Sequence, residues 1–329
     1  MYEVDVQGTY YEMGFKVGRR LKEVGYVPPP PAPARWSYIL ACEAIISQHA
    51  PELLEELQGC IDGSGYNADA MKALVIGLDD EPACSIVALG GPWTPDGNIL
   101  FGRNYDGSSS FTEFNTVYRT APHNALASFG CSNIFIGRLD GLNEAGLAVA
   151  VASVGHDDEQ PGIMCHLVVR SILDRCREVA DAVEFLERIP HTWNCNYLIA
   201  DASRNIAIVE ASPQQVLKRY ITDGFATITN HFQSPVMAHY ERIEERPPDS
   251  EDRLCKIQQW LERQNNPVGH SELQKMLRDR KNGAYTYRWY NNMSEPMVTL
   301  WSWTAILGER QVQLDMGLRS HKGFVTYEF

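Results

Sequence analysis

Apolar residues in the first quarter of the chain recur at helical spacing. Met13, Val17 and Leu21 fall on one face of a predicted helix over residues 9–24. The same pattern predicts further helices over 36–50, 51–62 and 67–78. The proline-rich stretch 28–33 predicts an extended loop after the first helix. The first 80 residues are therefore expected to be mostly helical.

Short apolar runs separated by turn residues begin at residue 84 and predict strands. The first set spans 84–90, 98–106, 114–120, 133–139 and 146–153. Two predicted helices (164–177 and 179–189) are followed by strands over 196–201, 205–211, 215–221 and 225–229. The last elements are helices over 236–245, 250–264 and 271–280 and strands over 297–307, 311–317 and 323–328. This order indicates two antiparallel sheets with helices outside, because a parallel sheet needs strands and helices to alternate.

Composition and charge place the chain among acidic globular proteins. Its 329 residues are 44% hydrophobic and 22% charged, with a formal net charge of −13. Such a charge disfavours nucleic acid and anionic membranes as partners, and no apolar run approaches the roughly 20 residues of a membrane span. The acidic opening Met1–Asp5 differs from a secretory signal peptide. We therefore expect a soluble, cytoplasmic protein with no nucleic-acid or membrane partner.

The eight cysteines form no Cys-x-x-Cys pair, and no His or Cys cluster has the spacing of a zinc site. We therefore expect no metal and no other cofactor. The sequence leaves the oligomeric state open.

One cysteine, Cys84, is placed beside charged residues by the predicted hairpin. Residues 94–97 read Thr-Pro-Asp-Gly, a turn sequence between two apolar runs. Folding at this turn brings Arg103 and Asp106 to the level of Cys84, which makes the thiol a candidate nucleophile. A regular strand would place those two side chains on opposite faces, so both reach Cys84 only if the strand ends or bulges near Asn104.

A thiol nucleophile needs a base, because the thiolate is the form that attacks. No histidine lies near Cys84 in sequence, although a distant one could complete a dyad. If the bond before Cys84 were cut, its free α-amino group, with a pKa of about 7.7–8, could accept the thiol proton. Downstream, Asn230 ends an apolar strand, where its amide could donate to an oxyanion. Arg253 falls in the first turn of a helix for which Ser250 is the predicted N-cap.

Each of these polar residues also has a structural interpretation. Arg103 and Asp106 could form an ion pair at the end of the hairpin, and Asn230 could be an ordinary turn residue. Arg253 could lie on a solvated helix face. The aromatic-rich stretch 285–303 could line an acyl pocket, but core packing is its commoner role.

Several segments carry a family resemblance in their order and spacing. The most specific is Gly102-Arg103-Asn104-Tyr105-Asp106, and Cys84 stands in the place of a nucleophile. The others lie at residues 7–14, 54–65, 142–148, 229–232 and 250–253. Together they resemble the acyl-coenzyme A:6-aminopenicillanic acid acyltransferase-like family of N-terminal nucleophile (Ntn) hydrolases, which is related to the choloylglycine hydrolases.

The resemblance implies an α+β fold, the four-layer αββα sandwich of two antiparallel sheets, with a helical N-terminal pro-region. It implies autoproteolysis between Ala83 and Cys84. The pro-region over residues 1–83 would then remain as a small subunit beside a catalytic domain over residues 84–329.

The resemblance also implies roles for the candidate residues. Cys84 is the nucleophile, Arg103 and Asp106 position it, Asn230 binds the oxyanion and Arg253 supports the site. The implied reaction is amide hydrolysis or acyl transfer through a thioester, on a small-molecule or peptide-like amide or an acyl thioester, with no cofactor.

Two positions depart from the family pattern. Ala83 stands where the acyltransferase relatives usually carry Gly, whose backbone freedom assists self-cleavage. Ser153 replaces a second oxyanion Asn of the choloylglycine hydrolases, which disfavours a bile-salt substrate. Two alternatives stay open: an uncleaved family member that binds or scaffolds, and a Cys–His hydrolase without maturation that uses His231.

Overall fold

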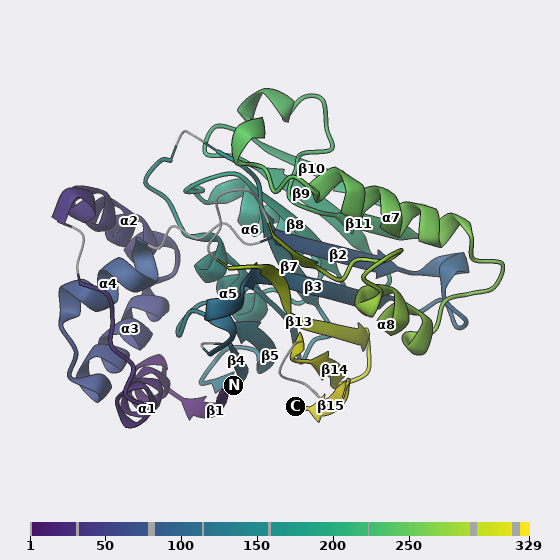
Figure 1. Ribbon diagram of the computed structural model, residues 1–329. Coiled ribbons are helices and arrows are strands. Elements are labelled where there is room, and N and C mark those ends of the chain that lie inside the picture. Colours follow the sequence, from purple (N-terminus) through teal and green to yellow (C-terminus); the bar gives the residue numbers. More distant parts are fainter. Residues whose placement is uncertain are drawn as a thin grey trace.

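The computed structural model describes residues 2–30, 33–77, 83–113, 115–156, 159–222, 224–289, 295–317 and 323–329. Two sheets are stacked face to face, with helices on both outer faces (Figure 1). The four-layer α+β sandwich predicted from the sequence is therefore confirmed.

The larger sheet has eight strands, which lie side by side in the order β1 (Tyr2–Gly8), β4 (Thr116–Pro122), β5 (Ser128–Ser132), β6 (Asp140–Asn143), β7 (Ala148–Ser153), β8 (Cys195–Ala200), β9 (Ile206–Ala211) and β10 (Val216–Tyr220). The second sheet runs in the order β11 (Phe225–Ile228), β2 (Ala83–Leu89), β3 (Leu100–Ser108), β13 (Met297–Ile306), β14 (Gln311–Asp315) and β15 (Val325–Glu328). The short β12 (Tyr287–Arg288) pairs with β13. The pairing of β1 with β4 is parallel, whereas the other described strand pairs are antiparallel.

Helices α5 (Cys165–Arg175) and α6 (Val179–Arg188) cover the larger sheet, and α7 (Ser250–Glu262) and α8 (His270–Arg278) cover the second. The described residues of the N-terminal region include four α-helices, which Figure 1 shows together at one side of the sandwich: α1 (Tyr10–Glu23), α2 (Trp36–His49), α3 (Pro51–Ser64) and α4 (Ala68–Ile76). All four were predicted. Within the described residues, no helix is both long and apolar enough to cross a membrane.

Helices α1 and α3 pack with their backbones in contact. A Cβ atom on Gly14 would lie 1.9 Å from the carbonyl oxygen of Glu56, and one on Gly59 would lie 2.1 Å from that of Tyr11. Real Cβ atoms do not approach a backbone oxygen this closely, so any larger residue at either glycine forces the helices apart. This close packing fixes how α1 and α3 are oriented relative to each other, and therefore which of their side chains face the sandwich.

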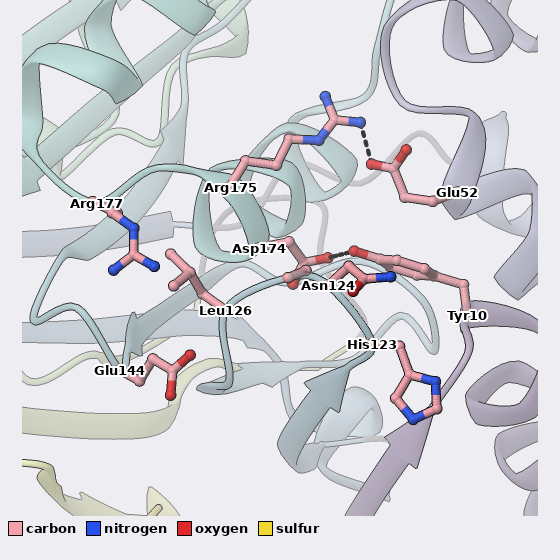
Figure 2. Close-up of a pocket in the computed structure, with 10 residues that line it drawn as sticks. Tyr10, Glu52, His123, Asn124, Leu126, Glu144, Asp174, Arg175 and Arg177 are labelled. Carbon is pink, nitrogen blue, oxygen red and sulfur yellow. Dashed lines mark hydrogen bonds and ion pairs between the residues drawn. The ribbon is translucent and has the colours of Figure 1, made fainter.

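Buried charges join this face to helix α5. Glu56 of α3 lies 3.1 Å from Arg170, which also donates to Asp174 at 2.8 Å, and both acidic side chains are fully buried. The hydroxyl of Tyr10 donates to Asp174 at 3.0 Å. Arg175 pairs with Glu52 at the edge of a cavity of about 610 Å³ between the N-terminal helices and the sandwich (Figure 2).

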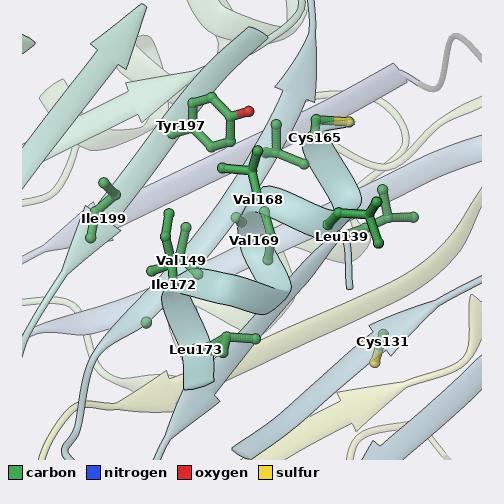
Figure 3. Close-up of a cluster of buried hydrophobic side chains, with 14 of the residues drawn as sticks. Cys131, Leu139, Val149, Cys165, Val168, Val169, Ile172, Leu173, Tyr197 and Ile199 are labelled. Atoms are coloured by element: carbon green, nitrogen blue, oxygen red, sulfur yellow. The ribbon is translucent and has the colours of Figure 1, made fainter. Parts of the chain in front are cut away.

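Helix α5 lies across the larger sheet on an apolar face. Val168 and Ile172 project from it toward Val149 of β7 and Ile199 of β8 (Figure 3). All four side chains lie in one core cluster and are excluded from solvent. At roughly 25 cal/mol per Å² of buried apolar surface, such contacts anchor this layer.

Strand β1 was not predicted, and it pairs with β4 over seven residues, Tyr2 to Gly8. A short alternating segment is a weak signal by itself, and the partner strand lies more than a hundred residues away in sequence. The N-terminal region therefore contributes a strand to the sandwich as well as four helices.

Two predicted elements were wrong. Residues 133–139 form a buried connection between β5 and β6 rather than a strand, and the amide of Arg138 donates to the carbonyl of His166. Residues 236–245 form two short 3₁₀ turns instead of a helix. Their backbone bonds to Gly155 and Asn194, which removes the intrahelical partners. An apolar run cannot distinguish these outcomes without the tertiary partners.

Candidate active site

The predicted hairpin of β2 and β3 holds the candidate nucleophile. Its turn is closed by Gly97, at φ +73°, and by the Asp96 carboxylate, which accepts from the amide of Asn98 at 3.0 Å. The register sets Cys84 opposite Tyr105. Because directly opposed residues share a face of the sheet, Cys84, Tyr105 and Arg103 all point between the two sheets.

The structure brings Arg103 to the thiol of Cys84. Its Nη2 donates to Cys84 Sγ at 2.9 Å, and both side chains are fully buried. Its Nη1 donates to Asp140 Oδ2 and to the carbonyl of Leu139, each at 2.7 Å. Asp140 belongs to the opposite sheet and also accepts from the indole of Trp301 at 2.8 Å. The guanidinium therefore stays charged beside the sulfur because a buried carboxylate neutralises it.

Asn230 and Arg253 contact the backbone of Cys84. The amide N–H of Cys84 donates to Asn230 Oδ1 at 2.6 Å, and Arg253 donates to the carbonyl oxygen of Cys84. Arg253 also donates to Asn230 Oδ1 at 2.9 Å. The other end of the Asn230 amide donates to the carbonyl of Ser153 at 2.9 Å. In the intact chain Asn230 thus holds the nitrogen of the Ala83–Cys84 peptide bond.

Asp106 lies apart from the thiol. Strand β3 continues without a break to Ser108, and the irregularity in this region falls on β13 instead, between Thr299 and Trp301. Asp106 therefore faces away from Arg103, opposite Ala83, as strand alternation requires. Its carboxylate accepts from the hydroxyl of Thr299 at 2.6 Å and from that of Thr286 at 3.0 Å.

Sequence reasoning missed two carboxylates that hold the candidate arginines. Asp140 approaches Arg103 from the other sheet, and no local sequence pattern around Asp140 predicts this contact. Asp249 accepts from Arg253 Nε at 3.1 Å and lies 3.2 Å from Arg288. The four-residue spacing of Asp249 and Arg253 is a helical ion-pair signal that could have been used. Asp249 is also the N-cap position of α7 that the sequence analysis had assigned to Ser250.

The thiol is neutral in the intact chain. Burial raises the pKa of Cys84 to about 11, although the nearby Arg103 guanidinium acts in the opposite direction. A thiol with this pKa is almost wholly protonated near neutral pH, so the chemistry requires a base.

The described contacts of His231 do not include the Cys84 thiol. Its Nδ1 bonds with the hydroxyls of Thr229 and Ser250, at 3.1 Å and 2.8 Å. Burial lowers its pKa to about 4, and the Arg246 charge acts in the same direction. These contacts do not favour the Cys–His alternative. Among the described residues, no group of three or more His, Cys, Asp or Glu side chains is arranged to hold a metal ion.

We expect Asp106 to impose a pH dependence on stability. Burial raises the pKa of its carboxyl from 3.8 to about 6, although the Arg253 charge opposes the shift. Because the folded state holds this proton more tightly than the unfolded chain, the stabilisation is complete below about pH 4 and is lost as the pH rises through about 6. At 1.36 kcal/mol per pKa unit the loss is about 3 kcal/mol. Urea unfolding of wild type and Asp106→Asn at about pH 4 and about pH 7 measures it as the difference between the two proteins. Parallel stability profiles would contradict the expectation.

The fold agrees with solved structures of Ntn hydrolases. A variant of conjugated bile acid hydrolase from Clostridium perfringens is 15% identical, with a TM-score of 0.55, over 74% of this chain and 92% of that chain. An N-acylethanolamine-hydrolyzing acid amidase ortholog from Caenorhabditis elegans is 13% identical, with a TM-score of 0.50, over 75% of this chain and 100% of that chain. The protein therefore has the fold of the Ntn hydrolases.

The family follows from a sequence comparison. Residues 93–320 match the family model of acyl-coenzyme A:6-aminopenicillanic acid acyl-transferase. The chain belongs to this family, and it is an enzyme of the acyltransferase or amide-hydrolase type. The match includes Arg103, Asp106, Asn230 and Arg253 but begins after Cys84. No curated protein matches the chain.

Proposed function

We propose that the protein is a cysteine-nucleophile amide hydrolase or acyltransferase that matures by cleavage between Ala83 and Cys84. One observation carries the proposal: the thiol, the amide and the carbonyl of Cys84 each bond with a different polar side chain. These partners are Arg103 for the thiol, Asn230 for the amide and Arg253 for the carbonyl. Buried polar groups concentrated on one cysteine in this way are typical of a reaction centre.

In the proposed maturation, the thiol of Cys84 adds to the carbonyl carbon of Ala83. The C–N bond between the two residues breaks, the acyl chain passes to sulfur as a thioester, and the nitrogen gains the thiol proton. Water then hydrolyses the thioester, which leaves a carboxylate on Ala83 and a free thiol and α-amine on Cys84. That amine, with a pKa of about 7.7–8, becomes the missing base.

In the proposed turnover, the α-amine of Cys84 takes the thiol proton and the thiolate attacks the acyl carbon of the substrate. The Arg103 guanidinium stabilises the thiolate, and the amide of Asn230 donates to the developing oxyanion. The departing amine takes the proton, and a thioester remains. Water completes a hydrolysis, whereas an amine acceptor completes an acyl transfer.

The fold alone does not identify the substrate, so we infer its class from the proposed reaction, in which a thiolate attacks an acyl carbon. The solved relatives are named for conjugated bile acids and N-acylethanolamines, and the family is named for an acyl transfer from coenzyme A. We propose a small-molecule or peptide-like amide, or an acyl thioester, as substrate. Ser153, in place of an asparagine, disfavours bile salts.

We propose further that residues 1–83 stay bound to residues 84–329 after the cut. The β1–β4 pairing and the burial of Glu56 against Arg170 support this. Removing Glu56 from this cluster would leave the buried Arg170 with only one of its two carboxylate partners, Asp174, which disfavours separation of the fragments. The N-terminal fragment is then the enzyme's own small subunit.

Thiol labelling tests the proposal. In the intact chain Cys84 has no exposed surface and a pKa of about 11, so iodoacetamide at about pH 7 should leave it unmodified. After cleavage we expect its modification to be at least about tenfold faster, since its own amine then acts as base. Peptide mass mapping reads both states, and the exposed Cys255 should react equally in each. If Cys84 stayed as unreactive as the buried Cys131 in the cleaved protein, the proposed nucleophile would be wrong.

A second candidate function is an uncleaved protein that binds or scaffolds. The observation that favours it is Ala83, which lies in regular strand pairing with Asp106 and lacks the backbone freedom of glycine. A purified protein that remains one chain and acquires no acyl group at Cys84 from activated acyl donors would support this function.

A further inference from the structure

Asn115 is a buried asparagine whose side chain makes no hydrogen bond within the described part of the chain. The residue is fully excluded from solvent, and both its Oδ1 and its Nδ2 lack a partner among the described residues. Native proteins leave few buried polar atoms unpaired, because each unpaired one destabilises the fold. A buried side chain with two unpaired polar atoms is therefore a candidate for binding a group from outside the chain.

Asn115 directly precedes β4, whose register shows which of its residues face the gap between the sheets. Asp140 faces the gap, since it contacts Arg103 of the other sheet, and its register partner Cys131 shares that face. Val117 is paired with Cys131 and shares it too. Alternate residues of a strand lie on one face, and Asn115 stands two positions before Val117, so continuing the alternation of β4 by one residue brings Asn115 to the same inner face.

Asn133 directly follows the neighbouring strand β5, as Asn115 directly precedes β4. The last pair of β4 and β5 is Thr116 with Ser132, so Asn115 and Asn133 follow it at the same end of the two strands. Asn133 is half-buried, and its Oδ1 also lacks a partner among the described residues. Its Nδ2 donates to the hydroxyl of Tyr105 at 3.3 Å, which confirms that it reaches the second sheet.

Tyr105 connects these amides to the nucleophile. It lies directly opposite Cys84 on the β2–β3 hairpin. Its ring stacks on Trp301, with centroids 4.0 Å apart and planes 12° apart, and the Arg103 guanidinium lies over it. The Asn133 amide is therefore about one tyrosine side chain away from the thiol, and Asn115 lies beside Asn133 at the same end of β4 and β5.

We propose that Asn115 and Asn133 form a polar subsite for the acyl part of the substrate, and that they recognise a second amide within that acyl group. This inference rests on the proposed function of Cys84. The unpaired atoms are one donor and two acceptors, and a secondary amide of the acyl group offers both an N–H and a C=O in return. A plain alkyl chain would leave the three unpaired atoms unsatisfied, so the subsite selects acylamino groups over fatty acyl groups.

The test compares matched acyl groups on one leaving group, 7-amino-4-methylcoumarin. The acylamino series is N-acetylglycyl, N-acetyl-β-alanyl and N-acetyl-γ-aminobutyryl, and its alkyl counterparts of equal length are pentanoyl, hexanoyl and heptanoyl. We expect the processed enzyme to favour at least one acylamino member over its alkyl counterpart by about tenfold or more in kcat/KM. Asn115→Leu, of nearly equal size, should bring that ratio close to one.

The matched control is Asn265→Leu, in the exposed connection after α7, which should keep the wild-type ratio. The inference is overturned if the wild type turns over both series with no preference at any length, or if Asn115→Leu keeps the preference. A gain in thermal stability of Asn115→Leu without a change in the ratio would mean that the asparagine is only an unpaired buried amide with no part in substrate binding. In each of these results turnover through Cys84 persists, so the proposed function would stand. If no member of either series is turned over and none acylates Cys84, the proposed function fails instead.

Discussion

Replacing Cys84 with alanine should leave a single uncut chain of 329 residues and reduce amide turnover by a factor of about 10⁴ or more. The variant removes the group that, in our proposal, attacks both the Ala83 carbonyl and the substrate. One small side chain is lost from a fully buried position, so the fold should survive with a stability loss of about 1 kcal/mol. Electrophoresis measures whether the chain is cut, and a coumarin-release assay measures amide turnover.

The matched control for Cys84→Ala is Cys131→Ala. Cys131 is also buried, and it points into the same gap between the sheets, but no proposed step uses it. We expect this variant to be cut and active. Equal cleavage and equal activity in Cys84→Ala would remove Cys84 from the mechanism.

Replacing Arg103 with methionine should reduce turnover by about a hundredfold or more and lower the free energy of unfolding by about 3–5 kcal/mol. The variant removes the only charged donor bonded to the sulfur among the described residues, and it leaves Asp140 as a buried carboxylate without its cation. Urea unfolding and kcat/KM measure the two losses.

A second substitution separates these two effects of Arg103→Met. In the double variant Arg103→Met with Asp140→Asn, neither charge remains, so much of the stability should return while turnover stays low. If turnover returned together with stability, Arg103 would only support the fold. If Arg103→Met alone remained fully active, its proposed role at the thiol would be wrong.

The sequence was sufficient for features that depend on local patterns. Met13, Val17 and Leu21 predicted α1, and all three are buried. The Pro-Asp-Gly turn predicted the hairpin that carries Cys84. The expected convergence of both Arg103 and Asp106 on Cys84 was right for Arg103 and wrong for Asp106. Strand alternation turns Asp106 to the other face, where it bonds to two threonines.

Features that depend on distant partners could not be predicted. Asp140 pairs with Arg103 from the other sheet, and Glu56 pairs with Arg170 from a distant helix. Neither pair has a local signal, because only the stacked layers bring the residues together. The connection 133–139 is apolar enough for a strand, yet its backbone finds partners elsewhere.

The sequence predicted which residues lie near Cys84 better than it predicted which of its atoms they contact. Asn230 and Arg253 were expected near the nucleophile, and the structure places both against its backbone rather than its sulfur. Their roles in catalysis stay predictions. Ala83 remains the deciding residue, since the peptide bond after it determines whether Cys84 gains an amine to act as its base.

The intact mass of the purified protein, together with the N-terminal residue of its larger fragment, shows whether the chain is cut before Cys84. We expect two fragments that elute together, residues 1–83 and residues 84–329, with Cys84 as the first residue of the larger one. A single full-length chain that turns over amides, and does so equally well as Cys84→Ala, would contradict this expectation.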